Sequence, residues 1–250
     1  MLHRINGPNF LVIYYLPIYF QSIRGQNAIE SGVNILPAVC FFALGCLCAG
    51  GLIGRIGYWQ PFLPAGALLS VVGSALIYSL DVDSSSAWYL GSQVIFGFGA
   101  GGSSQVPMIA VQGFSDTKDL SRATGVVLCK LHDQSAPVKI LIPITVFQLV
   151  NGAYFITAGQ SIFANQLLQS LPRLAPDVDP SHVLGTGAGD IHNVFAGAAL
   201  PGVLDAYMVG LKGAFALGLA AAAVCVPIGL LAPMKKLPEH KDRDEGAAFI

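Results

Sequence analysis

The residues that could carry catalysis are few, and they lie apart. His132 and Asp133 are adjacent in a polar interruption between two apolar runs, while His182, Asp190 and His192 lie in a later polar segment. Covalent catalysis needs a nucleophile within hydrogen-bond reach of a base, and a catalytic zinc ion needs three protein ligands. The sequence offers neither set, so we expect no enzyme activity, no cofactor and no metal site.

The cysteines do not change this expectation. They lack the paired CxxC spacing of zinc and redox sites. Most of them lie inside apolar runs, where cysteine behaves as a small hydrophobic residue. The five are Cys40, Cys46, Cys48, Cys129 and Cys225.

The stretch GFGAGG, residues 97–102, formally matches the glycine pattern of a dinucleotide-binding turn. That turn requires a strand before it and a helix after it, whereas here the glycines lie within one continuous apolar run. Small residues four positions apart allow helices in a membrane to approach closely. We therefore expect Gly97 and Gly101 to serve helix packing.

Uncharged polar residues inside the apolar runs are a further group of candidates. An amide buried in lipid is costly unless it finds a partner or water. Gln148, Asn151 and Phe155 share one helical face by their spacing, and two interpretations of such residues stay open: they line a substrate cavity, or they form hydrogen bonds between helices. The amide candidates for a cavity are Gln21, Gln105, Gln148 and Asn151.

The composition indicates which kind of protein must position these side chains. Of the 250 residues, 54% are hydrophobic and 11% are charged, whereas soluble domains carry about 25% charged residues. The net charge of −1 gives no basic face for nucleic acid, so we expect no nucleic-acid partner. The sequence predicts a multi-pass protein of the lipid bilayer.

The apolar residues fall into about six segments, each close to the roughly 20 residues that cross a hydrocarbon core. They should be helical, because the backbone in lipid must satisfy its own hydrogen bonds and the segments do not alternate as barrel strands do. The predicted fold is an all-α half-bundle, residues 1–233, followed by a cytoplasmic tail, residues 234–250. The predicted helices are near 8–23, 32–53, 62–80, 87–111, 123–128 joined with 147–168, and 205–233, with an interrupting insert at 129–146 and a weakly ordered external loop at 169–204.

Basic residues in short loops set the orientation, since lysine and arginine favour the cytoplasmic side. With the N-terminus inside, only Arg24 and Arg173 lie outside. Those inside are Arg4, Arg55, Lys118, Arg122, Lys235, Lys236, Lys241 and Arg243. Lys212, within the last segment, is expected to reach the membrane surface or to form a structural ion pair.

Three stretches together carry a family resemblance: FLVIYYLPIYFQSIRGQNAIESGVNILP, residues 10–37; GGLIGRIGYWQPFLPAGALL, residues 50–69; and GFGAGGSSQVPMIAVQ, residues 97–112. They resemble the C-terminal half of fungal drug/proton antiporters of the major facilitator superfamily, in its fourteen-helix branch. The resemblance implies six helices and export of small amphipathic drugs, toxins or secondary metabolites by alternating access, with proton antiport in the full-length protein.

The resemblance also implies roles for individual residues. Gly54, Arg55 and Gly57 match the family's cytoplasmic turn, although Arg55 is equally well explained as a basic loop residue. Tyr14 and Tyr15, with Gln21 on the same helix and Gln105 on the fourth, are candidates to line the cavity. The expected partners are the lipid bilayer, the substrate and a missing N-terminal half, and the expected location is the plasma membrane or the vacuolar membrane.

The insert at 129–146 interrupts a helix that is continuous in the family. Its first residues, Cys129 to Leu131, can be encoded by codons containing an intron donor, and its last, Ile144 to Val146, by codons containing an acceptor, so we hypothesise a retained intron. The alternative is a real re-entrant or regulatory loop. On this basis the chain is expected to be a fragment of an exporter, with a non-transporting membrane subunit or a non-functional truncated relic as the alternative.

Overall fold

The computed structural model describes residues 2–107, 109–110, 141–195, 197 and 199–231. Within this part of the chain the architecture is helical, which confirms the predicted all-α class. The helices are α1 (Leu2–Ser22), α2 (Ala28–Ile56), α3 (Phe62–Tyr78), α4 (Ser86–Ser104), α7 (Leu141–Leu174), α8 (Pro180–Gly185), α9 (Ile191–Val194) and α10 (Ala199–Leu230).

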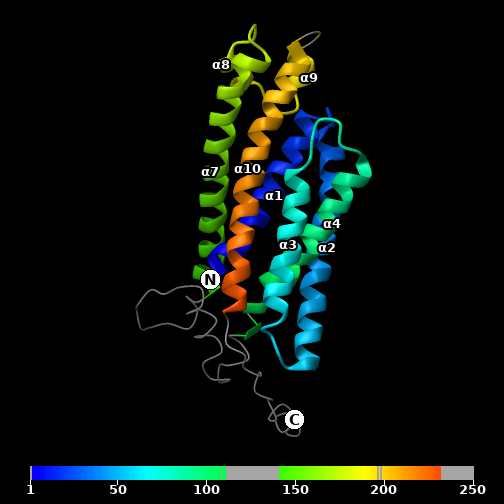
Figure 1. Ribbon diagram of the computed structural model, residues 1–250, viewed down its shortest axis with the longest axis vertical. Helices are drawn as coiled ribbons and strands as arrows, with labels where there is room; N and C mark the ends of the chain where they lie inside the picture. Colours follow the sequence, from blue (N-terminus) through cyan, green and yellow to red (C-terminus); the bar gives the residue numbers. More distant parts are fainter. Residues whose placement is uncertain (1, 108, 111–140, 196, 198, 232–250) are drawn as a thin grey trace.

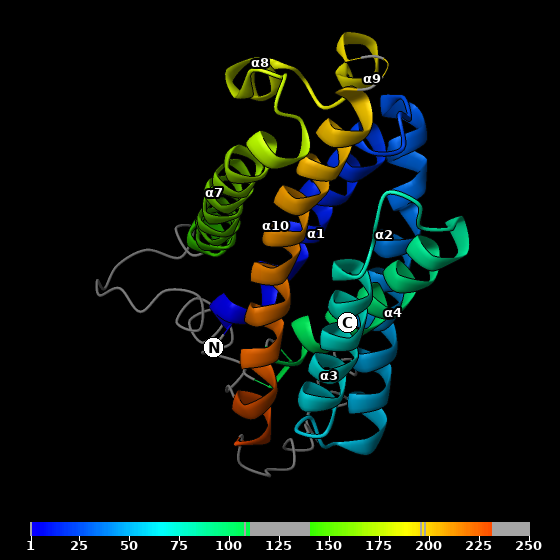
Figure 2. The same cartoon turned by 45° about the horizontal axis from the view of Figure 1, so that its top comes forward.

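The long helices lie side by side along the long axis of the molecule (Figure 1). α4 packs against both α2 and α3, and these three form one group. α7 lies at the opposite edge, where its main contacts are with α10 and α1. α10 also packs on α3, so α10 and α1 join α7 to the group of α2, α3 and α4 (Figure 2).

Glycines allow the helices of this group to touch through their backbones. A Cβ atom on Gly101 or Gly97 would overlap the backbone of α2 at Phe42 or Ala38. At the outer end of α7, Gly202 of α10 lies directly against the carbonyl of Leu174. Such contacts suit a membrane protein, because lipid supplies no hydrophobic drive and close packing must hold the helices together.

Local sequence fixes both ends of α2. Asn27 accepts the backbone N–H of Glu30 at 2.8 Å, and the Glu30 carboxylate accepts the backbone N–H of Asn27 at 3.3 Å, which completes a capping box. At the other end Gly57 adopts φ 75°, a left-handed conformation that costs glycine little. The cytoplasmic turn predicted at Gly54, Arg55 and Gly57 therefore coincides with the end of a helix.

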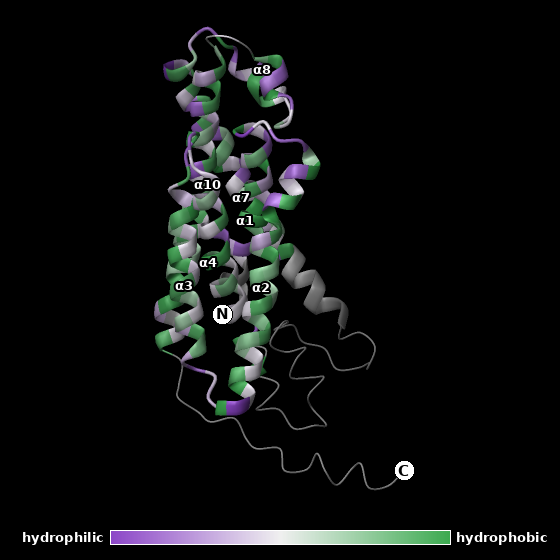
Figure 3. Ribbon diagram, turned by 90° about the vertical axis from the view of Figure 1, so that its right-hand side faces the viewer, coloured by the Kyte–Doolittle hydropathy of each residue, from purple (hydrophilic) through white to green (hydrophobic). Residues whose placement is uncertain are grey.

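Two of the described helices are long and apolar enough to cross a membrane, α2 and the stretch Ala199–Pro227 of α10. Only 17% of the most apolar part of α2 is buried inside the protein, against 44% for α10. The exposed side chains of α2 include Ile29, Val33, Leu36, Leu44 and Leu47. In Figure 3 hydrophobic colour covers the middle of the bundle, and hydrophilic colour gathers at α8 and at the lower end of α2.

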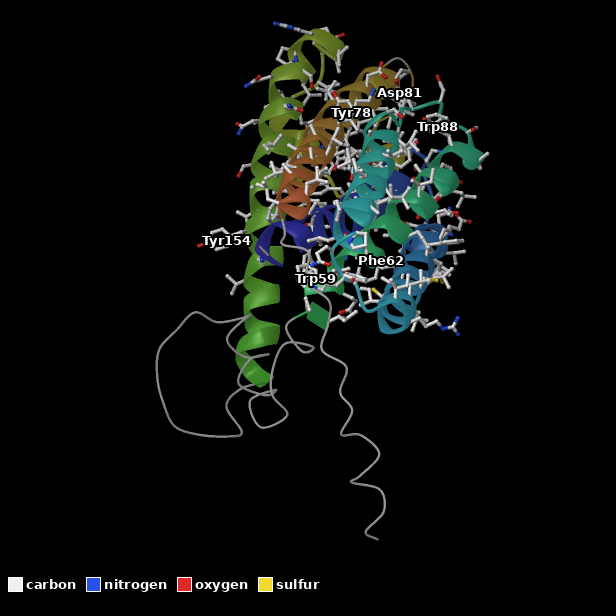
Figure 4. All side chains as sticks on the ribbon, turned by 60° about the horizontal axis from the view of Figure 1, so that its bottom comes forward. Trp59, Phe62, Tyr78, Asp81, Trp88 and Tyr154 are labelled. Carbon is white, nitrogen blue, oxygen red and sulfur yellow. The ribbon has the colours of Figure 1, made fainter. Side chains whose placement is uncertain are left out.

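Aromatic residues mark both ends of the bundle. Trp59 and Phe62 lie at the end that holds the α2–α3 loop, and Tyr78 and Trp88 lie at the end that holds the α3–α4 loop (Figure 4). Tyrosine and tryptophan prefer the two boundaries between lipid and water. α3, which runs between these pairs, is 17 residues long, about 25 Å at 1.5 Å per residue. We call the end with the α3–α4 loop, α8 and α9 the outer end, following the predicted orientation.

Several boundaries differ from the predicted ones. α7 begins at Leu141, so residues 141–146 of the expected insert are helical and continue directly into the predicted fifth helix. Residues 123–140, which hold the rest of the break, lie outside the described residues, and the retained-intron hypothesis stays a prediction.

The segment expected to be a weakly ordered loop, residues 169–204, contains the end of α7, both short helices and the start of α10. Its order has a physical reason, because Val183 of α8 and Ile191 of α9 are fully buried. Pro180 follows the capping residue Asp179, a favourable start for a helix.

Candidate functional site

α7 carries a polar face that no other described helix covers. Tyr154, with 69% of its surface exposed, points away from the bundle (Figure 4). Thr157, Ser161 and Asn165 follow it at three- and four-residue spacing, so they share one side of the helix, and all three are exposed. Gln160, three positions after Thr157, is exposed at the edge of this face. We call Tyr154, Thr157, Gln160, Ser161 and Asn165 the α7 polar face.

The contrast with α2 indicates what this face meets. The exposed residues of α2 named above are aliphatic and suit lipid. Ser161 donates its hydroxyl to the Thr157 carbonyl at 3.1 Å, a bond that makes a serine tolerable in lipid. A glutamine amide needs partners for its oxygen and for its NH₂ group, and an exposed NH₂ group is costly in hydrocarbon. The α7 polar face therefore suits water or a further protein segment better than lipid.

The depth of this face follows from an ion pair at the outer end. Lys212 of α10 lies 3.3 Å from a carboxylate oxygen of Asp81 in the α3–α4 loop, beside the aromatic residues at that boundary. The next residue, Gly213, contacts Gln166 of α7. Gln166 is thus near the outer boundary, and Gln160 lies about 9 Å deeper at 1.5 Å per residue. Most of the α7 polar face therefore lies between the two levels at which the aromatic residues gather.

A hydrogen bond joins this face to α1. The hydroxyl of Tyr15 donates to Oε1 of Gln160 at 3.3 Å and lies 3.4 Å from the carbonyl of Ile156. Tyr15 itself is fully buried. Its neighbour Tyr14 is 43% exposed and packs edge-on against it, with ring centroids 5.0 Å apart. Exposed Tyr14 and exposed Gln160 therefore flank one buried phenol.

Aromatic packing holds Tyr15 in place. Phe163 of α7 lies 6.2 Å from the Tyr15 ring, and Tyr207 of α10 packs edge-on against Phe163 at 4.9 Å. Gly159 of α7 leaves no room for a side chain beside the Tyr15 ring, so α7 approaches α1 closely next to the hydrogen bond between Tyr15 and Gln160. The printed contacts of Tyr15 therefore come from α1 and α7, while Tyr207 of α10 supports Phe163 from behind.

The outer loop covers the end of α1. The ring nitrogen Nε2 of His192 lies 2.9 Å from the carbonyl of Ser22, and the same ring packs on Gly25. α9 therefore sits at the outer end of α1, while α8 lies over the end of α7 (Figure 2). At the start of α8, hydrogen bonds from Ser181 lower the pKa of Asp179, whose carboxylate caps the helix.

The predicted cavity residues are distributed between different environments. Tyr14 and Tyr15 come together as described. Gln21 is half-buried beside Gly189 in the outer loop. Gln105 is exposed at the C-terminal end of α4, the end opposite the outer one, and is far from the other residues along the bundle.

The face predicted from Gln148, Asn151 and Phe155 does not coincide with the exposed one. Asn151 is 3% exposed, and Phe155 packs against Gly7 of α1. Gln148 lies in α7, but its side chain is outside the described residues. The exposed polar residues Thr157, Gln160 and Ser161 escaped prediction, and their three- and four-residue spacing was the signal that could have revealed them.

Several fungal proteins align with most of this chain. The chain is 48% identical over 239 residues to a dehydrocurvularin exporter of Aspergillus terreus, covering 95% of this chain and 39% of that protein. It is 48% identical to a dehydrocurvularin exporter of Alternaria cinerariae, covering 94% and 37%. It is 49% identical to an efflux pump of an Aspergillus species, covering 93% and 38%.

The chain thus spans less than two fifths of the length of these relatives. No solved structure matches it. The family model that matches residues 5–129 is that of the Major Facilitator Superfamily. These residues include most of α1 and all of α2, α3 and α4, and thus the close packing of α4 on α2. The chain belongs to the Major Facilitator Superfamily of membrane transporters.

Proposed function

We propose that this chain forms the C-terminal, substrate-facing half of an exporter of small fungal metabolites. The observation that carries the proposal is the α7 polar face, which lies at membrane depth and carries uncharged hydrogen-bonding groups. The relatives of this chain are named as exporters and efflux pumps, which supports transport out of the cytoplasm. A half-bundle with one face suited to lipid and another suited to water or protein fits a carrier in which two halves rock around a central site.

The chemistry of the face favours neutral or amphipathic substrates. The residues of the face supply aromatic surface and hydrogen bonds without formal charge, and Tyr14 of α1 adds a second exposed aromatic ring. Export of a charged molecule would require an opposite charge to offset its desolvation, and the described part of this face has none. We therefore assign drugs, toxins or secondary metabolites with apolar bodies as the substrate class.

Proton antiport is part of the proposal, with the coupling group placed elsewhere. Among the described residues, the ion pair closest to the membrane is Lys212 with Asp81, at the outer boundary. An antiporter needs a titratable group inside the membrane. We propose that this group belongs to the other half of the transporter, and that the assembly resides in the plasma membrane or the vacuolar membrane.

A chimera tests the proposed function. The matching C-terminal stretch of the Aspergillus terreus dehydrocurvularin exporter is replaced by this chain and expressed in a yeast strain that lacks its own major efflux pumps. We expect the chimera to lower the cellular content of dehydrocurvularin, and an uncoupler to abolish the effect.

The control is the same chimera with Gln160 replaced by Arg, which places an unpaired charge on the α7 polar face and should abolish export. A chimera that reaches the membrane folded but exports nothing would contradict the proposal. That result would favour a non-transporting membrane subunit or a relic. Export that survives an uncoupler would refute the antiport part alone.

A further inference from the structure

The orientation of one amide deepens the proposed function, on which this inference rests. Tyr15 is buried and its hydroxyl donates to Oε1 of Gln160 at 3.3 Å. A glutamine amide has one acceptor oxygen and one NH₂ group with two donors. Because the oxygen accepts from Tyr15, the NH₂ group is the part of this exposed amide that remains for another partner.

The exposed neighbour is also a potential donor. Tyr14 is 43% exposed and its ring packs edge-on on Tyr15, so a large part of its surface is open to a ligand. A phenol can donate one hydrogen bond. The pair Gln160 and Tyr14 therefore offers N–H and O–H donors beside an aromatic surface, with no carboxylate in their described surroundings.

We infer that Tyr14 and Gln160 form a subsite for a carbonyl oxygen carried on a planar, aromatic ligand, and that Tyr15 is the positioning residue that turns the Gln160 amide toward it. The ring of the ligand lies on Tyr14, and its carbonyl accepts from Gln160 Nε2. The substrate class of the proposed exporter is thereby narrowed to neutral aromatic ketones, lactones and esters.

Selectivity arises from the cost of an unpaired donor. A ligand of the same shape without the carbonyl leaves the NH₂ group desolvated and without a partner, and sites built around such a bond discriminate for this reason. A net hydrogen bond corresponds to a preference of about three- to tenfold. Replacing Tyr15 by Phe retains the ring packing but frees the amide to turn over, so the preference should fall without loss of apolar binding.

Benzophenone is a suitable photoprobe, because it carries a carbonyl oxygen on an aromatic body and labels the residues beside it on irradiation. Excited benzophenone takes a hydrogen atom from a nearby C–H bond, and the two radicals combine into a C–C bond, which converts the ketone into a tertiary alcohol. The whole chain in proteoliposomes is irradiated, and labelled peptides are quantified by mass spectrometry. Peptides of lipid-facing α2 report nonspecific labelling from the bilayer in the same sample.

We expect labelling of the peptides containing Tyr14 or Gln160 to exceed that of α2. Unlabelled acetophenone, a ketone, should compete about three- to tenfold better than ethylbenzene, which lacks the oxygen. Gln160→Leu and Tyr15→Phe should remove this preference. Gln160→Glu should also remove it, because a carboxylate offers no donor. The matched control Gln169→Leu, at another exposed glutamine of α7, should retain it.

Equal competition by acetophenone and ethylbenzene in the unmodified chain overturns the inference, as does a preference that persists in Gln160→Leu. A preference that persists in Tyr15→Phe refutes the positioning role. These outcomes are independent of the proposed function. A chimera that exports without any carbonyl preference leaves the transport proposal standing, whereas a chain that prefers the carbonyl but never supports export contradicts transport alone.

Discussion

Close packing of α4 on α2 predicts that a single methyl group at Gly101 is damaging. A Cβ there would overlap both the carbonyl and the Cα of Phe42, and these backbone atoms cannot move aside as the end of a flexible side chain can. Overpacking of this kind costs about 1–3 kcal/mol. The neighbouring glycine, Gly102, has no atom within 4 Å of an added Cβ.

This neighbour supplies a matched control. Replacing glycine by alanine inside a helix stabilises it by about 1 kcal/mol through conformational entropy, and this gain is common to both positions. Gly102→Ala should therefore be neutral or stabilising. Gly101→Ala should be less stable than Gly102→Ala by about 1–3 kcal/mol, since the steric overlap is the difference between the two variants.

The measurement is unfolding in detergent micelles, followed by circular dichroism and by the fluorescence of Trp59 and Trp88. Both variants are compared with the unmodified chain at equal detergent concentration. Equal stability of the two alanine variants would refute the idea that backbone contact at Gly101 holds α2 and α4 together. A loss in Gly102→Ala alone would reverse the assignment of the packing face.

Three further outcomes follow from contacts outside the α7 polar face. Lys212→Met and Asp81→Asn should each change the unfolding free energy by less than about 1 kcal/mol, because the ion pair is partly exposed and screened by solvent. A large drop in melting temperature in a thermal-shift assay would mean instead that the pair is shielded from water. His192→Ala should speed proteolysis of the outer loop, because the ring fastens α9 to the end of α1; unchanged cleavage kinetics would argue against that attachment. Ser181 lowers the pKa of Asp179 below its ordinary 3.8, so the cap stabilises α8 fully above pH 3.8 and is lost as the pH falls through the lower pKa of the folded state. Amide hydrogen exchange in α8 should therefore become faster in that acidic range, and in Asp179→Asn it should not. If the variant shows the same pH profile as the unmodified chain, the cap is contradicted.

The sequence predicted the elements whose signals are local. Long apolar runs indicated the spans of α2, α3 and α4, and Gly57 marked the end of α2. The outer segment was harder, because α8 and α9 are short and depend on burial of single residues such as Val183 and Ile191. No pattern in the sequence predicts that His192 of this polar segment contacts a backbone carbonyl of α1.

Only part of the candidate site could be predicted from the sequence. The resemblance indicated Tyr14 and Tyr15, and the structure adds that one is exposed and the other buried. The sequence could not show which side of α7 faces the bundle, because Gln148 and Asn151 form as regular a polar stripe as Thr157, Gln160 and Ser161. Which stripe is exposed depends on where Phe10 and Tyr15 of α1 touch α7, and this is a tertiary contact between segments far apart in the sequence.

The two ends of α7 are attached in different ways, and this difference has a mechanical consequence. At the outer end, Gly202 places the backbone of α10 directly against Leu174, so there is little room for displacement. At the inner half, contact with α1 passes through side chains, Phe10 on Gly152 and Phe155 on Gly7. Rings can slide and change rotamer where backbones cannot. We therefore expect any tilting of α7 to be smallest at the outer end, where Gly202 lies, and largest at the opposite end, where Phe10 and Phe155 make the contacts.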